Sequence, residues 1–122
     1  MTREEEIQKL LIKLKNAVES ITGSAIVTKR GLIISKIFDF EINTRMLGGI
    51  AASIVGPTTR ISKTLFDVKS FKIDTIETEK GSVIIMDLES AILVVMTKPK
   101  PNVGLILFEM EKISENIEEV MK

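Results

Sequence analysis

The chain has 122 residues, and its 17 Lys and Arg residues balance its 17 Asp and Glu residues, so the formal net charge is zero. This balance argues against a broad basic field, so neither nucleic acid nor an anionic membrane surface is an expected partner. Cysteine and histidine are both absent, which excludes disulfides and thiolate or imidazole metal sites and favours a cytoplasmic protein. We expect one domain, residues 1–122, with no secretory signal at its polar start and no apolar run long enough for membrane insertion.

The chain begins with the pattern of an amphipathic helix followed by a β-hairpin. Thr2 and Glu5 form a capping box, and apolar residues then recur at spacings of three and four as far as Gly23. Two short runs rich in β-branched residues follow, at 24–28 and 32–37. The turn between them ends in glycine, which tolerates the positive φ of a tight reversal, so these runs predict two paired strands.

A second helix is expected after a linker that contains Phe38 and Phe40. Asn43 or Thr44 can cap this helix, and Pro57 within it predicts a kink or a break near Gly56. A projection at 100° per residue gathers one group of apolar side chains on the side expected to pack against a sheet. These are Leu47, Ile50, Ile54, Ile61 and Leu65.

Three strands and a last helix complete the predicted order. Residues 71–75 alternate between apolar and polar, which is typical of a half-buried edge strand, whereas 83–86 and 92–96 are apolar throughout, as central strands are. Prolines at 99 and 101 end the last strand, and Asn102 can cap the final helix. Its predicted core stripe is Val103, Ile106, Leu107, Met110, Ile113, Ile117 and Val120.

The other side of the second helix carries small residues at spacings of three and four. Such spacing lets another helix approach closely, and the predicted edge strand has no proline or inward charge to prevent pairing with a second strand. We therefore predict a symmetric dimer whose interface residues are Gly49, Ala52, Ser53, Gly56, Phe71, Ile73 and Thr75. The alternative is that the small residues lie under a loop of the same chain or on a neutral surface.

Few residues suit catalysis or ligand binding. Asp39 with Glu41, and Asp87 with Glu89, could act as acid and base, but their position at strand ends is typical of turn and surface residues. The glycine pair at 48–49 lies inside the helical pattern and lacks the rest of a phosphate-binding motif. We therefore predict no catalytic residues, no cofactor and no metal.

Much of the chain resembles the Roadblock family, which includes the dynein roadblock light chains and prokaryotic regulators of Ras-like GTPases. Residues 23–34 are similar to the opening hairpin of the family, with Arg30-Gly31 where Asp-Gly is usual, and residues 46–54 are similar to its small-residue helix. The closing strands and last helix are matched by residues 81–88, 91–96 and 102–104.

The resemblance implies an α+β fold, a profilin-like Roadblock sandwich. Its antiparallel sheet has five strands in the order 2-1-5-4-3, with the first and last helices on one face and the second helix on the other. Family members dimerise through the third strand and second helix and bind a small Ras-like GTPase or a larger scaffold, and some accelerate GTP hydrolysis without inserting a catalytic residue. The implied function is a non-catalytic homodimeric adaptor or regulator, with Arg45, Arg60 and Lys63 contacting the partner. The alternative is a small-ligand sensory domain of profilin-like topology, with a polar pocket beside the Phe38–Phe40 linker.

Overall fold

The computed structural model describes all 122 residues as three helices and five strands in the predicted order. The helices are α1 (Arg3–Ala17), α2 (Thr44–Phe66) and α3 (Val103–Met121). The strands are β1 (Ile21–Val27), β2 (Ile33–Phe38), β3 (Ile73–Thr78), β4 (Gly81–Asp87) and β5 (Ile92–Thr97). None of the helices combines the length and the hydropathy that crossing a membrane would require.

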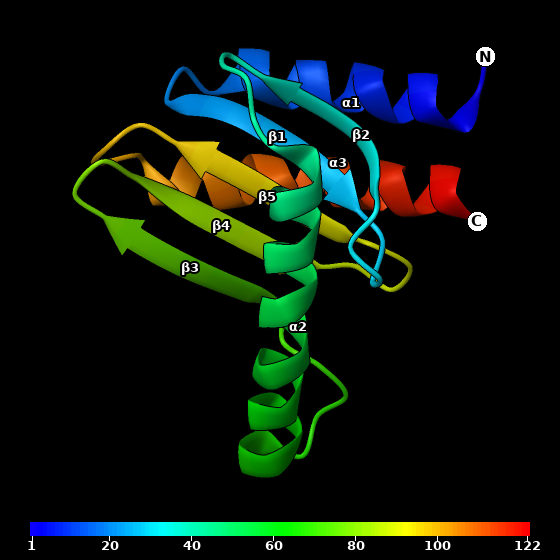
Figure 1. The fold of residues 1–122 in the computed structure, drawn as a ribbon, viewed down its shortest axis with the longest axis vertical. Coiled ribbons are helices and arrows are strands. Elements are labelled where there is room, and N and C mark those ends of the chain that lie inside the picture. Colours follow the sequence, from blue (N-terminus) through cyan, green and yellow to red (C-terminus); the bar gives the residue numbers. More distant parts are fainter.

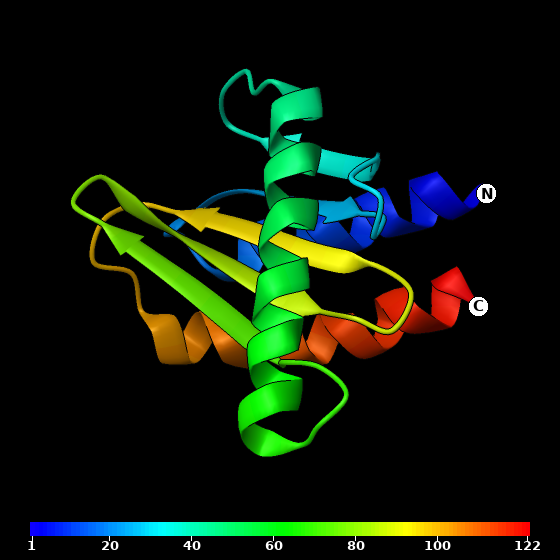
Figure 2. The ribbon, with the colours of Figure 1, turned by 60° about the horizontal axis from the view of Figure 1, so that its bottom comes forward.

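The five strands form one antiparallel sheet in the order β2-β1-β5-β4-β3, as the family resemblance implied. Helices α1 and α3 lie side by side on one face, and α2 crosses the other face (Figures 1 and 2). The predicted fold class is therefore confirmed. The edges of the sheet are β2 at one end and β3 at the other.

The core has two layers of apolar side chains, one on each face of the sheet. The larger layer lies under α1 and α3 and includes Ile7, Leu11 and Met110, each fully buried. The predicted stripe of α3 is confirmed at its centre, where four side chains are buried: Ile106, Met110, Ile113 and Ile117. The smaller layer lies under α2 and includes Ala25, Ile85 and Val94.

Side-chain caps fix where the helices begin. The side chains of Thr2, Asn43 and Asn102 accept hydrogen bonds from backbone N–H groups three residues further on, at 3.2, 2.9 and 3.1 Å. Asn43 is therefore the cap of α2, and Thr44 is its first residue. Gly31 has a φ of 92°, which confirms the predicted use of glycine in the hairpin turn.

Several predicted boundaries were wrong. Helix α2 continues through Pro57 without the predicted break, and the proline is exposed, so water can hydrate the carbonyl that loses its N–H partner. Helix α1 ends at Ala17 rather than near Gly23, since the chain from Ile21 onward pairs with β5. Strand β3 begins at Ile73, two residues later than predicted.

The predicted sheet-facing side of α2 was also largely wrong. Of its five apolar residues only Leu47 is buried, whereas Ile50 is 52% exposed and Leu65 is 69% exposed. The reason is that α2 approaches the sheet through small residues: Gly48 lies so close to the β1–β2 turn that a Cβ there would be 1.9 Å from the carbonyl oxygen of Gly31. The larger side chains of the predicted stripe, Ile50, Ile61 and Leu65, are thereby left exposed, while Ile54 is half-buried.

Candidate protein-interaction surface

The β3 edge of the sheet is open and regular. Strand β3 pairs with β4 without a bulge, from Ile73 opposite Met86 to Thr78 opposite Gly81, and no strand pairs with its other side. The β2 edge differs, because the β1–β2 ladder contains a bulge and β2 carries an exposed lysine, Lys36. Bulges and edge lysines discourage pairing with a further strand. Of the two edges, β3 is therefore the better template for strand addition.

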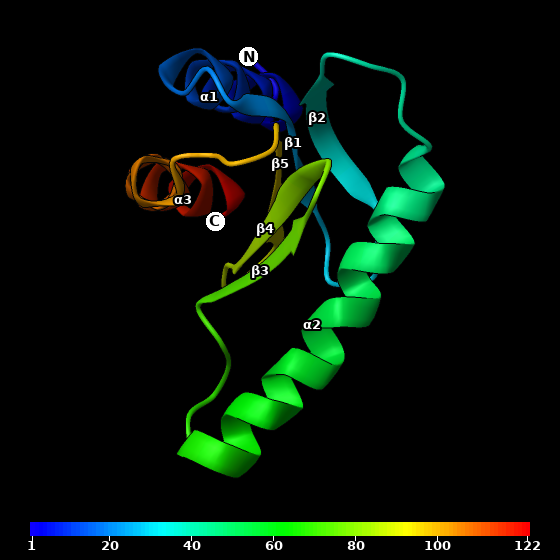
Figure 3. The same cartoon turned by 90° about the vertical axis from the view of Figure 1, so that its left-hand side faces the viewer.

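Helix α2 crosses the sheet from the β2 side to the β3 side and continues past the β3 edge (Figures 1 and 3). The crossing point is fixed by a hydrogen bond of 3.0 Å from the Thr58 hydroxyl to the Asp74 carboxylate of β3. At the next residue of α2, Thr59 and Ser70 share a hydrogen bond of 3.2 Å that holds the returning loop. The last two turns of α2 therefore project beyond the sheet of their own chain.

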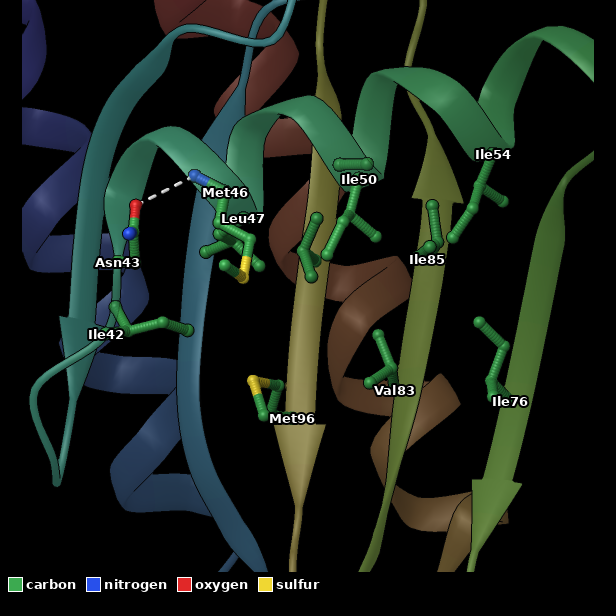
Figure 4. A pocket seen from close by; sticks show the side chains of 12 residues that line it. Ile42, Asn43, Met46, Leu47, Ile50, Ile54, Ile76, Val83, Ile85 and Met96 are labelled. Atoms are coloured by element: carbon green, nitrogen blue, oxygen red, sulfur yellow. Dashed lines mark hydrogen bonds between the residues drawn. The ribbon is translucent and has the colours of Figure 1, made fainter.

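A row of exposed apolar side chains runs along the flank of α2 that faces β3. We call this row the apolar flank, and it consists of Met46, Ile50, Ile61 and Leu65, which are 60%, 52%, 54% and 69% exposed. Between its first half and strands β3, β4 and β5 lies an open groove of about 220 Å³ (Figure 4). The groove is lined by Ile42, Asn43, Met46, Leu47, Ile50, Ala51, Ile54, Ile76, Val83, Ile85, Val94 and Met96.

Asn43 is the polar residue of this lining. Its side-chain oxygen already accepts a hydrogen bond from the Met46 N–H, which caps the start of α2. The groove therefore offers apolar contact and little hydrogen bonding. An open apolar surface next to an unpaired strand edge is typical of a protein–protein interface.

Comparison with known proteins identifies the family. The model of the Roadblock/LC7 domain matches residues 7–97. The protein belongs to the Roadblock/LC7 family. The uncharacterized protein MJ1340 of the archaeon Methanocaldococcus jannaschii is 32% identical over 111 residues, which are 91% of this chain and 96% of that protein.

Solved structures share the fold of this Roadblock/LC7 chain. Myxococcus xanthus MglB superimposes with a TM-score of 0.88 at 21% identity, covering 97% of this chain and 89% of MglB. An MglB described as having a tetrameric arrangement gives a TM-score of 0.89 at 14% identity, covering 98% and 90% of the two chains. At these identities the likeness concerns the fold.

The small residues predicted for the interface fall into two groups. Gly49, Ser53 and Gly56 are exposed, and a Cβ added to either glycine would meet no atom within 4 Å. Ala52 is half-buried beside the β1–β2 turn. A Cβ added to Gly31 in that turn would lie 3.5 Å from the Cβ of Ala52. Ala52 therefore packs partly against its own chain, while the other three face solvent.

The remaining predicted interface residues lie on or just before β3. Phe71 packs against the core layer under α2, and Ile73 packs against the layer under α1 and α3, so both are half-buried in the protomer. Thr75 is exposed. Sequence reasoning assigned Ile50, Ile61 and Leu65 of the apolar flank to the sheet. It missed Met46 and also Ile76, which is 39% exposed and faces the groove.

The three cations predicted to contact a partner, Arg45, Arg60 and Lys63, are all exposed on α2. Helix α2 contains no acidic residue, so these cations have no opposite charge on their own helix. Their charge is therefore available to an acidic partner surface.

The candidate acid–base pairs are engaged in contacts that stabilise loops. Asp39 forms a 2.5 Å ion pair with Lys15, and the Asp87 carboxylate accepts hydrogen bonds from both Lys29 and Ser70. The N–H of Glu89 donates to Glu118 at 2.6 Å. No group of three carboxylates lies close enough together to hold a metal ion.

The pocket predicted for the sensor alternative has a different form in the structure. Beside the linker lies a shallow open depression lined by Lys36, Glu41, Ile42 and Asn43. Phe38 does not open a cavity there, because its ring packs into the core layer under α2 and edge-on against Phe40, with centroids 5.6 Å apart.

Proposed function

We propose that this protein is a non-catalytic homodimeric adaptor that binds a Ras-like small GTPase or a larger scaffold in the cytoplasm. The observation that carries the proposal is that the apolar flank of α2 and the open edge of β3 lie on the same side of the protomer. One two-fold axis beside β3 would cover both at once.

The homodimer is supported by the cost of leaving the apolar flank in water. Burying one large aliphatic side chain stabilises an interface by roughly 1.5–3 kcal/mol, and the flank contains four such side chains that are at least half exposed. In this proposal the predicted interface residues lie at the edge of the contact or directly behind it: Gly49, Ala52, Ser53, Gly56, Phe71, Ile73 and Thr75. To these the interface adds Met46, Ile50, Ile61, Leu65 and Ile76.

The GTPase partner is supported by membership of the Roadblock/LC7 family and by the charge of α2. Two helices α2 lying side by side would present Arg45, Arg60 and Lys63 from each chain on one outward surface. Charge complementarity of this kind accelerates encounter and selects among partners more than it raises affinity. In this proposal the adaptor changes GTP hydrolysis by remodelling the GTPase, whose own residues carry the chemistry.

The partner is tested by co-purification from the native source with and without a non-hydrolysable GTP analogue. We expect a Ras-like GTPase to be retained in one nucleotide state by the wild type and lost by the variant Arg45→Glu, Arg60→Glu, Lys63→Glu. The matched control reverses three exposed lysines outside α2, at Lys9, Lys13 and Lys100, and should retain the GTPase. Failure of the wild type to retain a GTPase in either state would contradict the proposed partner.

A further inference from the structure

We propose that the second copy of this chain pairs with β3 in one register, in which Ile76 lies opposite Ile76 of the partner subunit. This inference rests on the proposed homodimer and specifies how its two sheets join. It follows from symmetry, from the charges on β3 and from the direction of its backbone groups.

Symmetry limits the possible registers. If both helices α2 lie on the same face of the joined sheet, the two-fold axis is perpendicular to the sheet, and every residue faces the same side in both copies. Directly opposed residues of antiparallel strands also face the same side, so their numbers must differ by an even number. One residue of β3 must therefore lie opposite itself.

The charges on β3 eliminate two of these registers. An axis at Asp74 or at Glu77 would place two carboxylates directly opposite each other, which is destabilising. An axis at Ile73 or Thr78, the two ends of the strand, would leave almost no paired residues. Thr75 and Ile76 remain as possible centres.

The side chains favour Ile76 over Thr75. With Thr75 at the axis, Ile76 would lie opposite Asp74 of the partner subunit, and Ile73 opposite the partner's Glu77. With Ile76 at the axis, Thr75 lies opposite the partner's Glu77, Asp74 opposite the partner's Thr78, and the apolar side chain meets its own copy. Among the residues of β3, Ile73–Thr78, only the second arrangement places polar residues opposite polar ones and pairs Ile76, which is 39% exposed in the protomer, with an apolar side chain.

The backbone of β3 suits this register. The Asp87 N–H donates to the Lys72 carbonyl at 3.2 Å, so Lys72 and every second residue after it direct their backbone groups toward β4. Residues 73, 75 and 77 consequently direct theirs to the open edge. With Ile76 at the axis, Thr75 and Glu77 form the new hydrogen bonds, and Ile76 occupies a non-hydrogen-bonded pair, where opposed side chains are closest.

The same register gives the projecting end of α2 a surface to cover. Helix α2 continues past the β3 edge, the side on which the partner's strands would lie (Figure 3). Ile61 and Leu65 are exposed in that end, and at 100° per residue they continue the side of α2 on which Ile50 lines the groove. They would therefore cover the partner's groove, beside the central pair of Ile76 side chains. Figure 4 shows the Ile76 side chain of one protomer at the wall of its groove.

Single-cysteine variants test the register directly, because the wild type contains no cysteine. Ile76→Cys, Thr75→Cys and Glu77→Cys are each shown by light scattering to keep the oligomeric state of the wild type and are then oxidised with copper phenanthroline. Leu32→Cys, at an exposed position in the β1–β2 turn, measures random collision. We expect Ile76→Cys to form disulfide-linked dimers at least about ten-fold faster than the other three, because only its two Cβ atoms lie within the reach of a disulfide.

The outcomes separate this inference from the proposed function. Fastest cross-linking of Thr75→Cys would overturn the Ile76 register while leaving the homodimer intact. Dimers in which none of the three β3 variants cross-links above the Leu32→Cys rate would show that the copies do not join at β3. A wild type that is monomeric contradicts the proposed homodimer itself.

Discussion

Replacing Gly48 with alanine tests how α2 is positioned on the sheet. A Cβ at this residue would lie 1.9 Å from the carbonyl oxygen of Gly31 and 2.8 Å from its carbonyl carbon. Both atoms belong to the backbone of a tight turn whose glycine has a φ of 92°, so neither can move aside as a flexible side chain would. We expect Gly48→Ala to force α2 and the β1–β2 turn apart.

Two opposing effects set the size of the loss. Alanine is favoured over glycine in a helix by up to about 1 kcal/mol. Overpacking of a well-packed site is unfavourable by about 1–3 kcal/mol, and contact with backbone atoms puts this site at the upper end. The free energy of unfolding should therefore fall by about 1–2 kcal/mol, even though the substitution improves helix propensity.

Urea denaturation at a fixed protein concentration measures this change. The control is Gly104→Ala in α3, where the new Cβ would meet the Asn102 side chain at 3.8 Å, an ordinary van der Waals contact, on a helix outside the proposed dimer interface. We expect this control to unfold at the wild-type urea concentration or slightly above it. A Gly48→Ala variant as stable as the wild type would refute the close approach of α2 to the turn.

Substitutions at three further positions test the cap, the core and the loop contacts. Asn43→Ala should lower the free energy of unfolding by about 1 kcal/mol, measured by urea denaturation, because it removes the cap of α2, whereas Asn43→Asp should be nearly neutral. Leu11→Ala should lower it by about 2–5 kcal/mol, seen as a lower thermal midpoint, because the side chain is fully buried. Asp87→Leu should lower it by about 1–2 kcal/mol and make proteolysis after Lys69 faster, because Ser70 and Lys29 lose their shared acceptor.

The order of elements and the sheet topology could be predicted because local signals agree with the fold. The caps at Thr2 and Asn102 begin their helices where the sequence indicated, and the apolar runs of β4 and β5 are the central strands they resemble. The end of α1 was predicted wrongly for a physical reason. Residues 21–23 follow the helical pattern of α1, but they pair with β5 and so belong to β1. The spacing of apolar residues within one segment gives no information about a pairing strand that lies far away in the sequence.

The sequence pattern indicated the same side of the protomer as the candidate surface, but it assigned Ile50, Ile61 and Leu65 of α2 to the sheet although all three are exposed. The sequence indicated that α2 and the third strand are adjacent and open, which the protomer structure supports through the exposed glycines at 49 and 56 and the free β3 edge. The side of α2 that faces the sheet could not be predicted, because it depends on the contact between Gly48 and Gly31. A hydrophobic projection gives most weight to the largest apolar residues, whereas here the small residues Gly48 and Ala51 pack closely together with Leu47 and leave Ile50, Ile61 and Leu65 exposed.

The measurement that tests the homodimer most directly is light scattering of the wild type with two matched variants at tens of micromolar protein. Leu65→Glu and Leu32→Glu each replace a leucine that is about two-thirds exposed, 69% and 67%, so neither should unfold the protomer. Leu65 belongs to the apolar flank, and Leu32 lies in the β1–β2 turn. We predict a dimeric wild type, a monomeric Leu65→Glu and a dimeric Leu32→Glu. A monomeric wild type, or loss of the dimer in both variants alike, would contradict the proposed interface.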